Sequence, residues 1–347
     1  MADNIRVLVV DDSPVFCNFM KNEVGALNGI EIIDVAYNAD EAKQKILSLD
    51  PDVVTLDVEM PGISGIDFLK KFIPDKPIPV IVITSSPTSA FEAMSAGAIE
   101  FVRKPAGASK SELDQFVVRI ATVIRYAKIV KLQPKKVPVK INENANVNTA
   151  PLTIVGEPRK DLVIALGAST GGTEALVEVV RRFPKNTPPV LITQHMPPTF
   201  TKMFAERLDR ISHMSAKEAE DGDRLQQGQI IVAAGGNQMR LMKDARGYYI
   251  TSRPGEKVSG HCPSVDVLFS SVAEAAGANA IGAILTGMGG DGAEGLLKMR
   301  NAGAYTIGQD EETCVVYGMP AVAFKKGAVA IQLPIQKIGE HIILKVN

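Results

Sequence analysis

Residues 163–172 read VIALGASTGG, an apolar run that stops at a small serine flanked by glycines. A buried strand followed by Gly-x-Ser-x-Gly-Gly leaves three interpretations of Ser169 open. It can be a nucleophile, one side of a phosphate-binding turn, or part of a tight turn with no chemistry. The pentad alone is a weak signal for a hydrolase. The rest of the chain has to show what stands beside Ser169.

Short apolar runs alternate with amphipathic stretches on both sides of a polar segment, which predicts two α/β domains with doubly wound parallel sheets. We expect the first domain over 1–132 and the second, a Rossmann-like domain, over 158–347. Residues 133–157 are rich in Pro, Asn and Lys, show no hydrophobic period, and are predicted to be a linker. The expected strands are IRVLVV (5–10), IEIIDVAY (30–37), VVTL (53–56), VIVIT (80–84) and IEFV (99–102), then DLVIAL (161–166), PPVLITQ (188–194), GQIIVAA (228–234), NAIGAILT (279–286) and AYTIGQ (304–309).

The composition is that of a water-soluble enzyme or binding protein. Of 347 residues, 46% are apolar and 22% charged, so each half can bury a core. The formal net charge of -1 argues against a nucleic-acid partner. Three cysteines without metal-ligand spacing favour a reducing compartment. The start MADNIRVLVV does not resemble a signal peptide, and no run has the length of a membrane span. We therefore expect a cytoplasmic protein without direct membrane insertion.

Polar side chains gather at the strand ends of the first domain, where open parallel sheets carry their sites. Asp11 and Asp12 follow the first run and Asp57 the third, while Thr84 ends the fourth and Lys104 follows the fifth. Three clustered carboxylates repel one another unless a cation joins them, and oxygen ligands suit Mg²⁺. Such an ion would hold a phosphoryl group on one carboxylate. The alternatives are solvated loop acids, or a dinucleotide site, for which VVDDSPV lacks the glycines.

The segments LVVDDS, LDVEMPGISG, VITSS and FVRKP stand in the order typical of two-component receivers, and residues 5–125 resemble that flavodoxin-like domain. The resemblance implies that Asp57 accepts the phosphoryl group. It also implies Mg²⁺ as cofactor. Ser64 stands where many receivers carry Asp. The implied roles are Asp11, Asp12 and Asp57 as metal ligands, and Thr84 and Lys104 as the signalling pair.

A histidine and an aspartate follow later runs of the second domain. His195 comes directly after PPVLITQ, 26 residues beyond Ser169, which is the length of one strand–helix–strand unit. Asp291 follows NAIGAILT through the loop GMGGDG. We expect the strand ends to bring the three side chains together. Imidazole can take the serine proton at neutral pH, and a carboxylate can hold the imidazole in the required tautomer. The backbone N–H groups of Thr170 and Met288 are candidates for an oxyanion site.

Each of these residues also has an interpretation without catalysis. His195 before Met-Pro-Pro fits an ordinary loop histidine, Asp291 fits a helix cap, and GASTGG fits a phosphate turn. The phosphate turn lacks an acidic residue at the next strand end to hold a ribose. His261 in GHCPSVD is the competing base, but it follows a polar stretch and is predicted to be a substrate-loop or structural residue. The chain order Ser, His, Asp argues against a standard α/β-hydrolase.

Residues 161–335 resemble the catalytic domain of the chemotaxis-specific protein-glutamate methylesterases, on the segments GASTGG, QHMPPTFT, HCPSVDVLF, AILTGMGGDGAEGL and IGQDEETCVVYGMP. The resemblance implies that Ser169, His195 and Asp291 form a triad that needs no cofactor. It implies that the substrate is a γ-glutamyl methyl ester on cytoplasmic chemoreceptor domains, with amidase activity on receptor glutamines. It also implies that the chemotaxis histidine kinase is the phosphodonor of the receiver. Gly290 stands where relatives often carry a larger polar or basic residue.

The sequence is compatible with three classes of function. The first is a phosphorylation-activated esterase in which the unphosphorylated receiver covers the catalytic mouth. The second, a receiver joined to a DNA-binding output, lacks a basic recognition helix. The third is a receiver whose second domain is a non-catalytic binding module.

Overall fold

The computed structural model describes residues 4–105, 109–128 and 150–347. The chain divides into two compact units, Met1–Ile141 and Asn142–Asn347. Residues 133–149 of the predicted linker lie outside the described residues, and 150–157 carry no helix or strand. The domain boundaries at 132 and 158 therefore stay predictions.

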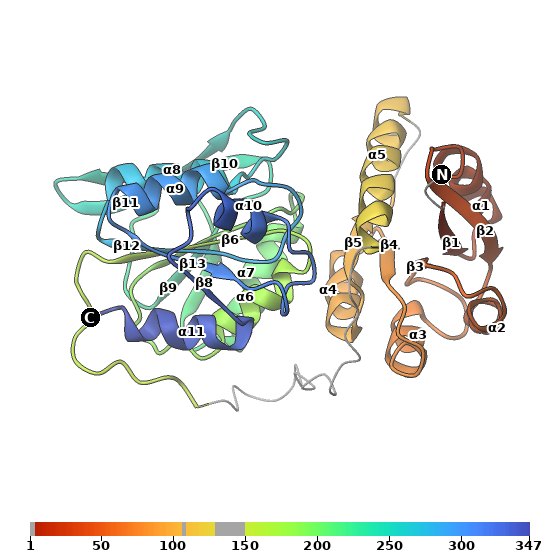
Figure 1. The fold of residues 1–347 in the computed structure, drawn as a ribbon, viewed down its shortest axis with the longest axis horizontal. Coiled ribbons are helices and arrows are strands. Elements are labelled where there is room, and N and C mark those ends of the chain that lie inside the picture. The colour runs from red at the N-terminus through yellow and green to blue at the C-terminus, as the bar shows by residue number, and fades with distance from the viewer. Residues whose placement is uncertain (1–3, 106–108, 129–149) are drawn as a thin grey trace. The chain divides into compact units, whose positions relative to one another are not determined.

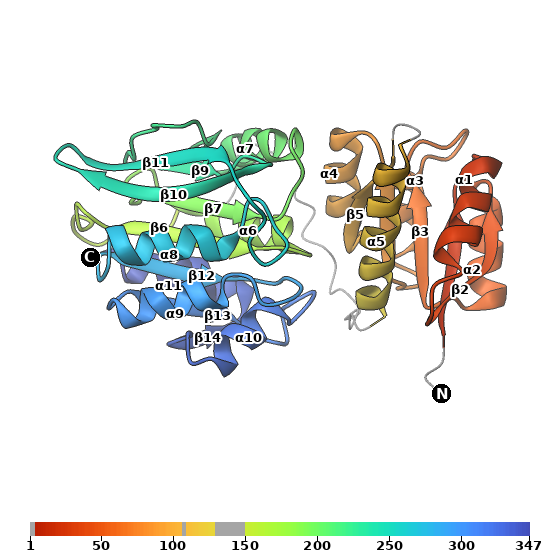
Figure 2. The same ribbon diagram turned by 90° about the horizontal axis from the view of Figure 1, so that it is seen from above.

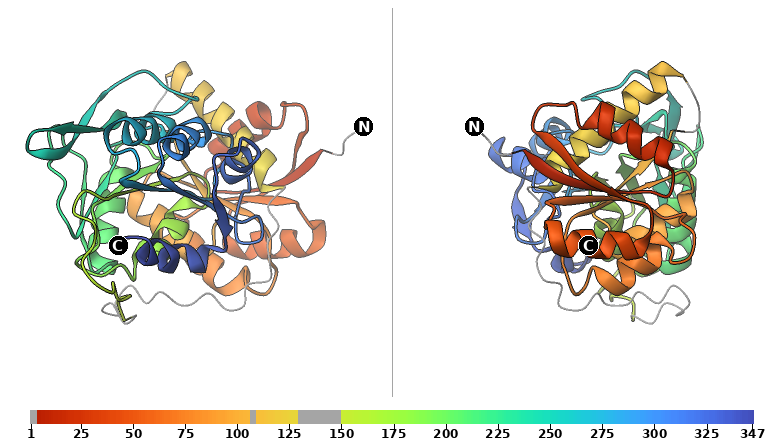
Figure 3. Two further views of the ribbon diagram at one scale, coloured as in Figure 1. Left: turned by 60° about the vertical axis from the view of Figure 1, so that its left-hand side comes forward. Right: turned by 90° about the vertical axis from the view of Figure 1, so that its right-hand side faces the viewer.

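The first unit is a five-stranded parallel sheet of order β2-β1-β3-β4-β5 with helices on both faces. Figure 2 shows α1 and α5 on one face and α2, α3 and α4 on the other, and Figure 3 (right) shows the sheet between the two layers. The strands are β1 (Ile5–Val10), β2 (Ile30–Ala36), β3 (Val53–Asp57), β4 (Val80–Thr84) and β5 (Glu100–Arg103). The helices are α1 (Pro14–Phe19), continued by the π-helical turn η1 (Met20–Val24), α2 (Ala39–Leu49), α3 (Gly65–Phe72), α4 (Pro87–Ala96) and α5 (Lys110–Ala127).

Local sequence sets where these helices begin. At the N-terminus of each of the five α-helices, a side-chain oxygen accepts a hydrogen bond from a first-turn amide, as N-cap residues do. Ser64 is one of them, because its Oγ accepts from the Asp67 N–H at 3.1 Å. Ser64, which stands where many receivers carry Asp, is therefore the N-cap of α3. The five caps are Ser13, Asn38, Ser64, Ser86 and Ser109.

The second unit is a seven-stranded parallel sheet of order β14-β13-β12-β6-β7-β9-β8, accompanied by an antiparallel hairpin of β10 and β11. In Figure 1, α8, α9 and α10 cover one face and α6, α7 and α11 the other. The strands are β6 (Val163–Ala168), β7 (Val190–Gln194), β8 (Ser215–Glu218), β9 (Gln229–Val232), β10 (Asn237–Asp244), β11 (Gly247–Pro254), β12 (Ala280–Ile284), β13 (Tyr305–Gln309) and β14 (Ile331–Leu333). The helices are α6 (Gly172–Val180), α7 (Phe200–Ile211), α8 (Val265–Ala275), α9 (Ala293–Asn301), α10 (Met319–Lys325) and α11 (Ile335–Leu344).

The predicted fold class, two doubly wound parallel α/β domains, is confirmed. Central strands β6, β7 and β12 are buried along their whole length, which explains their continuous apolar runs. Four strands were not predicted: β8, β10, β11 and β14. The edge strand β8 reads SAKE, and the hairpin strands carry charged residues on an open face, so neither shows the apolar run of a buried strand.

Candidate functional site

The strand ends of the first unit form a charged pocket around Lys104. Its Nζ lies 2.6 Å from Asp11 Oδ2 and 2.6 Å from Asp57 Oδ2, and both carboxylates are buried. The ammonium also lies 4.6 Å from the centroid of the Phe16 ring. Burial raises the pKa of Asp11 to about 6, although its hydrogen bond with Lys104 opposes the shift. The pocket therefore holds negative charge that a single lysine neutralises only in part.

A divalent cation fits beside this lysine. Oxygens of Asp11, Asp12 and Asp57 lie within 4.8 Å of one another, and Asp12 is exposed. Backbone amides orient the two buried carboxylates, from Ser13 to Asp11 Oδ1 and from Glu59 to Asp57 Oδ1, each at 2.9 Å. An all-carboxylate donor set with one side open to solvent suits Mg²⁺, which keeps several of its waters.

Thr84 ends β4 beside this pocket. Register places Asp57 of β3 opposite Ile83, so Thr84 is the next residue along the neighbouring strand. Its Oγ1 accepts a hydrogen bond from the Ser86 N–H at 3.0 Å. The structure thus brings all five residues predicted for this site to one sheet edge.

In the second unit, Ser169 opens a tight turn at the end of β6. The Gly172 N–H donates to the Ser169 carbonyl at 2.7 Å, and Gly171 adopts a left-handed φ of 74°. This is the geometry of a type II turn, which favours glycine at its third position. A Cβ on Gly172 would lie 2.6 Å from the Cβ of Ala168, which cannot move without its strand. Both glycines are therefore required by the conformation that presents Ser169.

Strand register places His195 beside Ser169. Ala168 pairs with Gln194 across β6 and β7, so Ser169 and His195 are the next residues on the two strands. The Gln194 side-chain amide donates to the Ser169 carbonyl at 2.9 Å and so joins the two strand ends. No hydrogen bond joins the Ser169 hydroxyl to the imidazole among the described residues. Catalytic hydrogen bonds are often long or poorly aligned without substrate.

The His195 imidazole is bound to Asp291. Its Nε2 lies 2.7 Å from Asp291 Oδ2, and both side chains are almost completely buried. Within the part of the chain that the structure describes, Nδ1 has no hydrogen-bond partner. Nδ1 is therefore the nitrogen left for Ser169. The ring of His261 stacks on that of His195, with centroids 3.6 Å apart and planes 7° from parallel. The predicted competing base is thus a neighbour of His195.

The N-terminus of α8 holds the Asp291 carboxylate. Ser264 Oγ donates to Oδ1 and the Val265 N–H to Oδ2, both at 2.7 Å, and the Asp266 N–H donates to Oδ1 at 3.1 Å. Burial alone would raise the pKa of Asp291, but hydrogen bonds from His195, Ser264 and Val265 outweigh it and lower the pKa. Sequence analysis missed Ser264 and this role of α8. A serine before an apolar helix was the only signal, and it predicts no more than a cap.

The two oxyanion candidates lie on loops that meet at Ser169. A Cβ on Gly287 would lie 2.8 Å from Ser169 Cβ, so the backbone preceding Met288 packs directly against the serine. Thr286 Oγ1 donates to the Thr170 carbonyl at 3.0 Å and ties the two loops together. Among the described residues, no acceptor is recorded for the N–H of Thr170 or of Met288. Both amides are thus available to a negatively charged oxygen.

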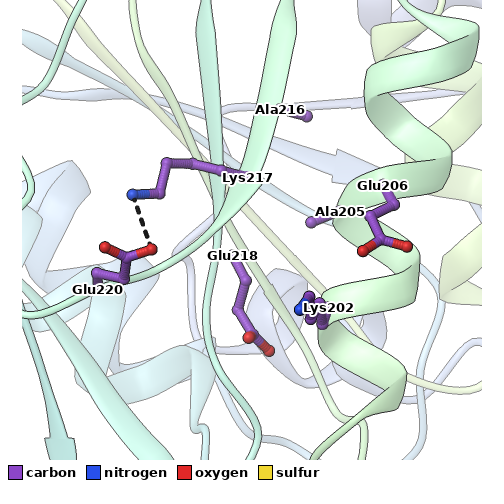
Figure 4. Close-up of a pocket in the computed structure, with 7 residues that line it drawn as sticks. All are labelled: Lys202, Ala205, Glu206, Ala216, Lys217, Glu218 and Glu220. Carbon is purple, nitrogen blue, oxygen red and sulfur yellow. Dashed lines mark ion pairs between the residues drawn. The ribbon is translucent and has the colours of Figure 1, made fainter.

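A separate pocket of about 290 Å³ lies between α7 and β8 (Figure 4). Its walls carry charges of both signs, including Lys217 paired with Glu220 at 3.3 Å. It contains none of the residues predicted for either site. The lining residues are Lys202, Ala205, Glu206, Ala216, Lys217, Glu218 and Glu220.

Over the described ranges, no helix is long and apolar enough to cross a membrane.

Known proteins resemble both units. Residues 164–342 match the family model of the CheB methylesterase, and residues 7–117 match that of the response regulator receiver domain. A protein-glutamate methylesterase/protein-glutamine glutaminase of Syntrophomonas wolfei is 46% identical, and the alignment covers 99% of this chain and 98% of that protein. A protein of the same name from Agrobacterium fabrum is also 46% identical over 99% and 97% of the two chains.

A solved structure agrees with these matches. The catalytic domain of the Thermotoga maritima CheB methylesterase superposes with a TM-score of 0.51 at 37% identity, and it covers 55% of this chain and 98% of its own. The fold, the two family models and the full-length relatives lead to one conclusion. The chain belongs to the CheB methylesterase family, with a response regulator receiver domain before the methylesterase domain.

Proposed function

We propose that the protein is a phosphorylation-activated serine hydrolase that removes methyl groups from γ-glutamyl methyl esters on chemoreceptors. The observation that carries the proposal is the arrangement at one sheet edge of Ser169, His195 and Asp291, with a 2.7 Å bond between the last two. Relatives that match the whole chain are named protein-glutamate methylesterases, which supports this substrate class.

The geometry supports a stepwise acyl transfer. His195 Nδ1 takes the proton of Ser169 Oγ while that oxygen attacks the γ-carbonyl carbon, and Asp291 stabilises the imidazolium through Nε2. The N–H groups of Thr170 and Met288 stabilise the oxyanion. When the tetrahedral intermediate collapses, the C–O bond to the methoxy group breaks, and the proton on Nδ1 leaves with methanol. Water then attacks the acyl-enzyme by the same route and releases the glutamate side chain and Ser169.

The same residues can hydrolyse a glutamine side chain. In that reaction the tetrahedral intermediate expels ammonia instead of methanol, and the proton on Nδ1 goes to the departing nitrogen. The relatives are named protein-glutamine glutaminases as well as methylesterases, which supports receptor glutamines as second substrates.

We propose that the receiver domain controls this activity through phosphorylation of Asp57 by a chemotaxis histidine kinase. Asp11, Asp12 and Asp57 would hold Mg²⁺, which neutralises charge on the transferred phosphoryl group. Lys104 would pair with a phosphoryl oxygen, and Thr84 would donate its hydroxyl proton, which the bond accepted from the Ser86 N–H does not use, to another. The close set of carboxylates around one lysine supports this assignment.

The test of the hydrolase is Ser169→Ala. The variant should fold normally, release no methanol from methylated receptors, and resist labelling by a fluorophosphonate that modifies the wild-type protein at Ser169. Thr173→Ala is a matched control, because it removes a buried hydroxyl of the first turn of α6 instead. Normal turnover by Ser169→Ala would reject the nucleophile. A wild-type protein that binds receptors but neither reacts nor turns over would be a non-catalytic binding module.

The test of the receiver is Asp57→Asn. Acetyl phosphate with Mg²⁺ should add one base-labile phosphoryl group to the wild-type protein, and none after chelation of the metal. Asp57→Asn should remain unlabelled, whereas Asp67→Asn, at an exposed carboxylate on α3, should be labelled normally. Labelling of Asp57→Asn at the wild-type rate would show that another residue is phosphorylated.

A further inference from the structure

Ser264 occupies a place in the methylesterase domain that capping alone does not explain. Its side chain is 1% exposed, and its hydroxyl contacts both the Asp291 carboxylate and the first turn of α8. We infer that Ser264 is a positioning residue for ester hydrolysis, whose O–H fixes the Asp291 carboxylate and thereby the plane of the His195 ring. The inference rests on the proposed function of Ser169, His195 and Asp291.

The hydroxyl of Ser264 donates its one proton to Asp291 and accepts a hydrogen bond from the first turn of α8. The Oγ lies 2.7 Å from Asp291 Oδ1, whereas the Val267 N–H reaches the same Oγ only at 3.4 Å. A bond from a neutral hydroxyl to a carboxylate is stronger than one between neutral groups. The short bond is therefore the one to Asp291, and the contact that caps the helix is the weaker of the two.

This bond limits rotation of the Asp291 carboxylate. Oδ2 accepts from His195 and from the Val265 N–H, and Oδ1 accepts from Ser264 and from the Asp266 N–H. Without the hydroxyl, Oδ1 keeps only the 3.1 Å bond from Asp266. The carboxylate could then turn about its own axis. Because Oδ2 holds the imidazole by a single hydrogen bond, that rotation would displace Nδ1 from Ser169.

The hairpin β10–β11 anchors the segment that carries Ser264. Gln238 of β10 accepts from the Ser264 N–H through Oε1 at 2.9 Å. Its Nε2 donates to the carbonyls of Glu256 at 2.9 Å and His261 at 3.2 Å. One side chain thus fixes both Ser264, which holds Asp291, and the backbone of His261, whose ring stacks on His195. The hairpin lies outside the seven-stranded sheet, and Gln238 connects it to the site.

Three substitutions separate positioning from capping. Ser264→Ala removes the hydroxyl and the cap. Ser264→Gly removes the hydroxyl but keeps most of the cap, because glycine is nearly as good as serine at this helix position. Ser264→Thr keeps both. Ser271→Ala is the control within the same helix, since its buried hydroxyl joins α8 to Leu241 of β10 and does not touch Asp291.

The measurements are kcat and KM for methanol release from a methylated receptor fragment, with thermal stability measured in parallel. Ser264→Ala and Ser264→Gly should each lower kcat about tenfold or more, in line with loss of a hydrogen bond to a charged group, and leave KM nearly unchanged. Ser264→Thr should restore most of kcat. Ser271→Ala should lower stability without lowering kcat. Wild-type kcat in Ser264→Gly would overturn the inference.

A second readout does not depend on ester hydrolysis. In protein labelled with ¹⁵N at histidine, the proton on His195 Nε2 should give a low-field resonance that His195→Gln removes. Ser264→Gly should shift or broaden that resonance, and Ser271→Ala should not. If the wild-type protein released no methanol, the proposed function would be wrong. The resonance would still test whether Ser264 fixes Asp291 and the His195 ring. An unchanged resonance in Ser264→Gly would reject that role.

Discussion

Lys104 is the cation shared by the two buried carboxylates of the receiver site. Replacing it by methionine leaves Asp11 and Asp57 facing each other without a positive charge, and breaking a buried pair in this way costs about 3–5 kcal/mol. Burial raises the pKa of Asp11 to about 6 in the intact protein. Since Lys104 opposes that shift, Asp11 should take up a proton still more readily in the variant. Lys104→Met should therefore destabilise the receiver domain most above pH 6 and progressively less as the pH falls.

Chemical denaturation in Mg²⁺-free buffer at pH 7.5 and at pH 5 measures this effect. Lys76→Met is the control, because it breaks an exposed ion pair with Asp50, and such pairs contribute little to stability. Saturating Mg²⁺ should reduce the loss in Lys104→Met at pH 7.5 by supplying another positive charge. An equal loss at both pH values would show that repulsion between the carboxylates is not its cause.

Asp291 should affect both the rate and the stability of the methylesterase domain. Asparagine in its place can hold the wrong imidazole tautomer, a change that costs about 10⁴-fold in kcat in the serine protease for which the triad was worked out. Because hydrogen bonds lower the pKa of Asp291 in the folded state, its charge stabilises the fold above the ordinary aspartate pKa. That contribution disappears as the pH falls through the folded-state value. Asp291→Asn should therefore be less stable than wild type at pH 7, and the difference should shrink as the pH falls below 3.8, the ordinary aspartate value, as thermal unfolding would show.

At the scale of elements, the loop between β12 and α9 sets the approach to Ser169. A Cβ on Gly287 would lie 2.3 Å from Met319 Sδ and 2.8 Å from Ser169 Cβ, whereas one on Gly290 would lie 3.1 Å from Val322 Cγ1, which can move. Neither glycine has a left-handed φ. Gly287→Ala should therefore lower kcat more than about 100-fold by displacing the serine and the Met288 amide, as removal of an oxyanion donor does. Gly290→Ala should stay within a few-fold of wild type.

Steady-state kinetics and crystal structures of the two variants measure the difference. Similar kcat values in Gly287→Ala and Gly290→Ala would show that close packing of this loop on Ser169 is not required.

The sequence predicted those parts of the site that follow directly from strand ends. Ser169 and His195 come one residue after paired strands, so periodicity and length were enough to place them together. The support of Asp291 by α8 could not be predicted, because the contact joins two helices' N-terminal loops rather than two strands. Gln238 was missed for a different reason. Its hairpin carries charged residues and packs on α8 through only one face, so the sequence shows no apolar run that would predict a strand there.

At the scale of the whole molecule, the question is why one chain carries two compact units. Relatives of nearly the same length carry both units, whereas the catalytic domain of the Thermotoga maritima protein was solved by itself. The methylesterase domain of that relative thus forms an ordered structure without a receiver. We therefore propose that the receiver of this chain is a regulator, which either blocks the catalytic mouth until it is phosphorylated or activates the enzyme by contact afterwards.

We expect blocking, and a fragment that begins near Thr153 distinguishes the two mechanisms. If the receiver blocks the catalytic mouth, a preference of about 1–3 kcal/mol for the covered state lowers the rate of ester hydrolysis roughly 5–150-fold. Removing the receiver should then relieve this repression. The fragment should then release methanol from methylated receptors faster than the unphosphorylated full-length protein, at a rate near that of the protein treated with acetyl phosphate and Mg²⁺. Asp57→Asn in the full-length protein should stay at the resting rate under the same treatment. If acetyl phosphate accelerates the full-length protein while the fragment is no faster than the resting form, the receiver activates by contact and blocking is wrong.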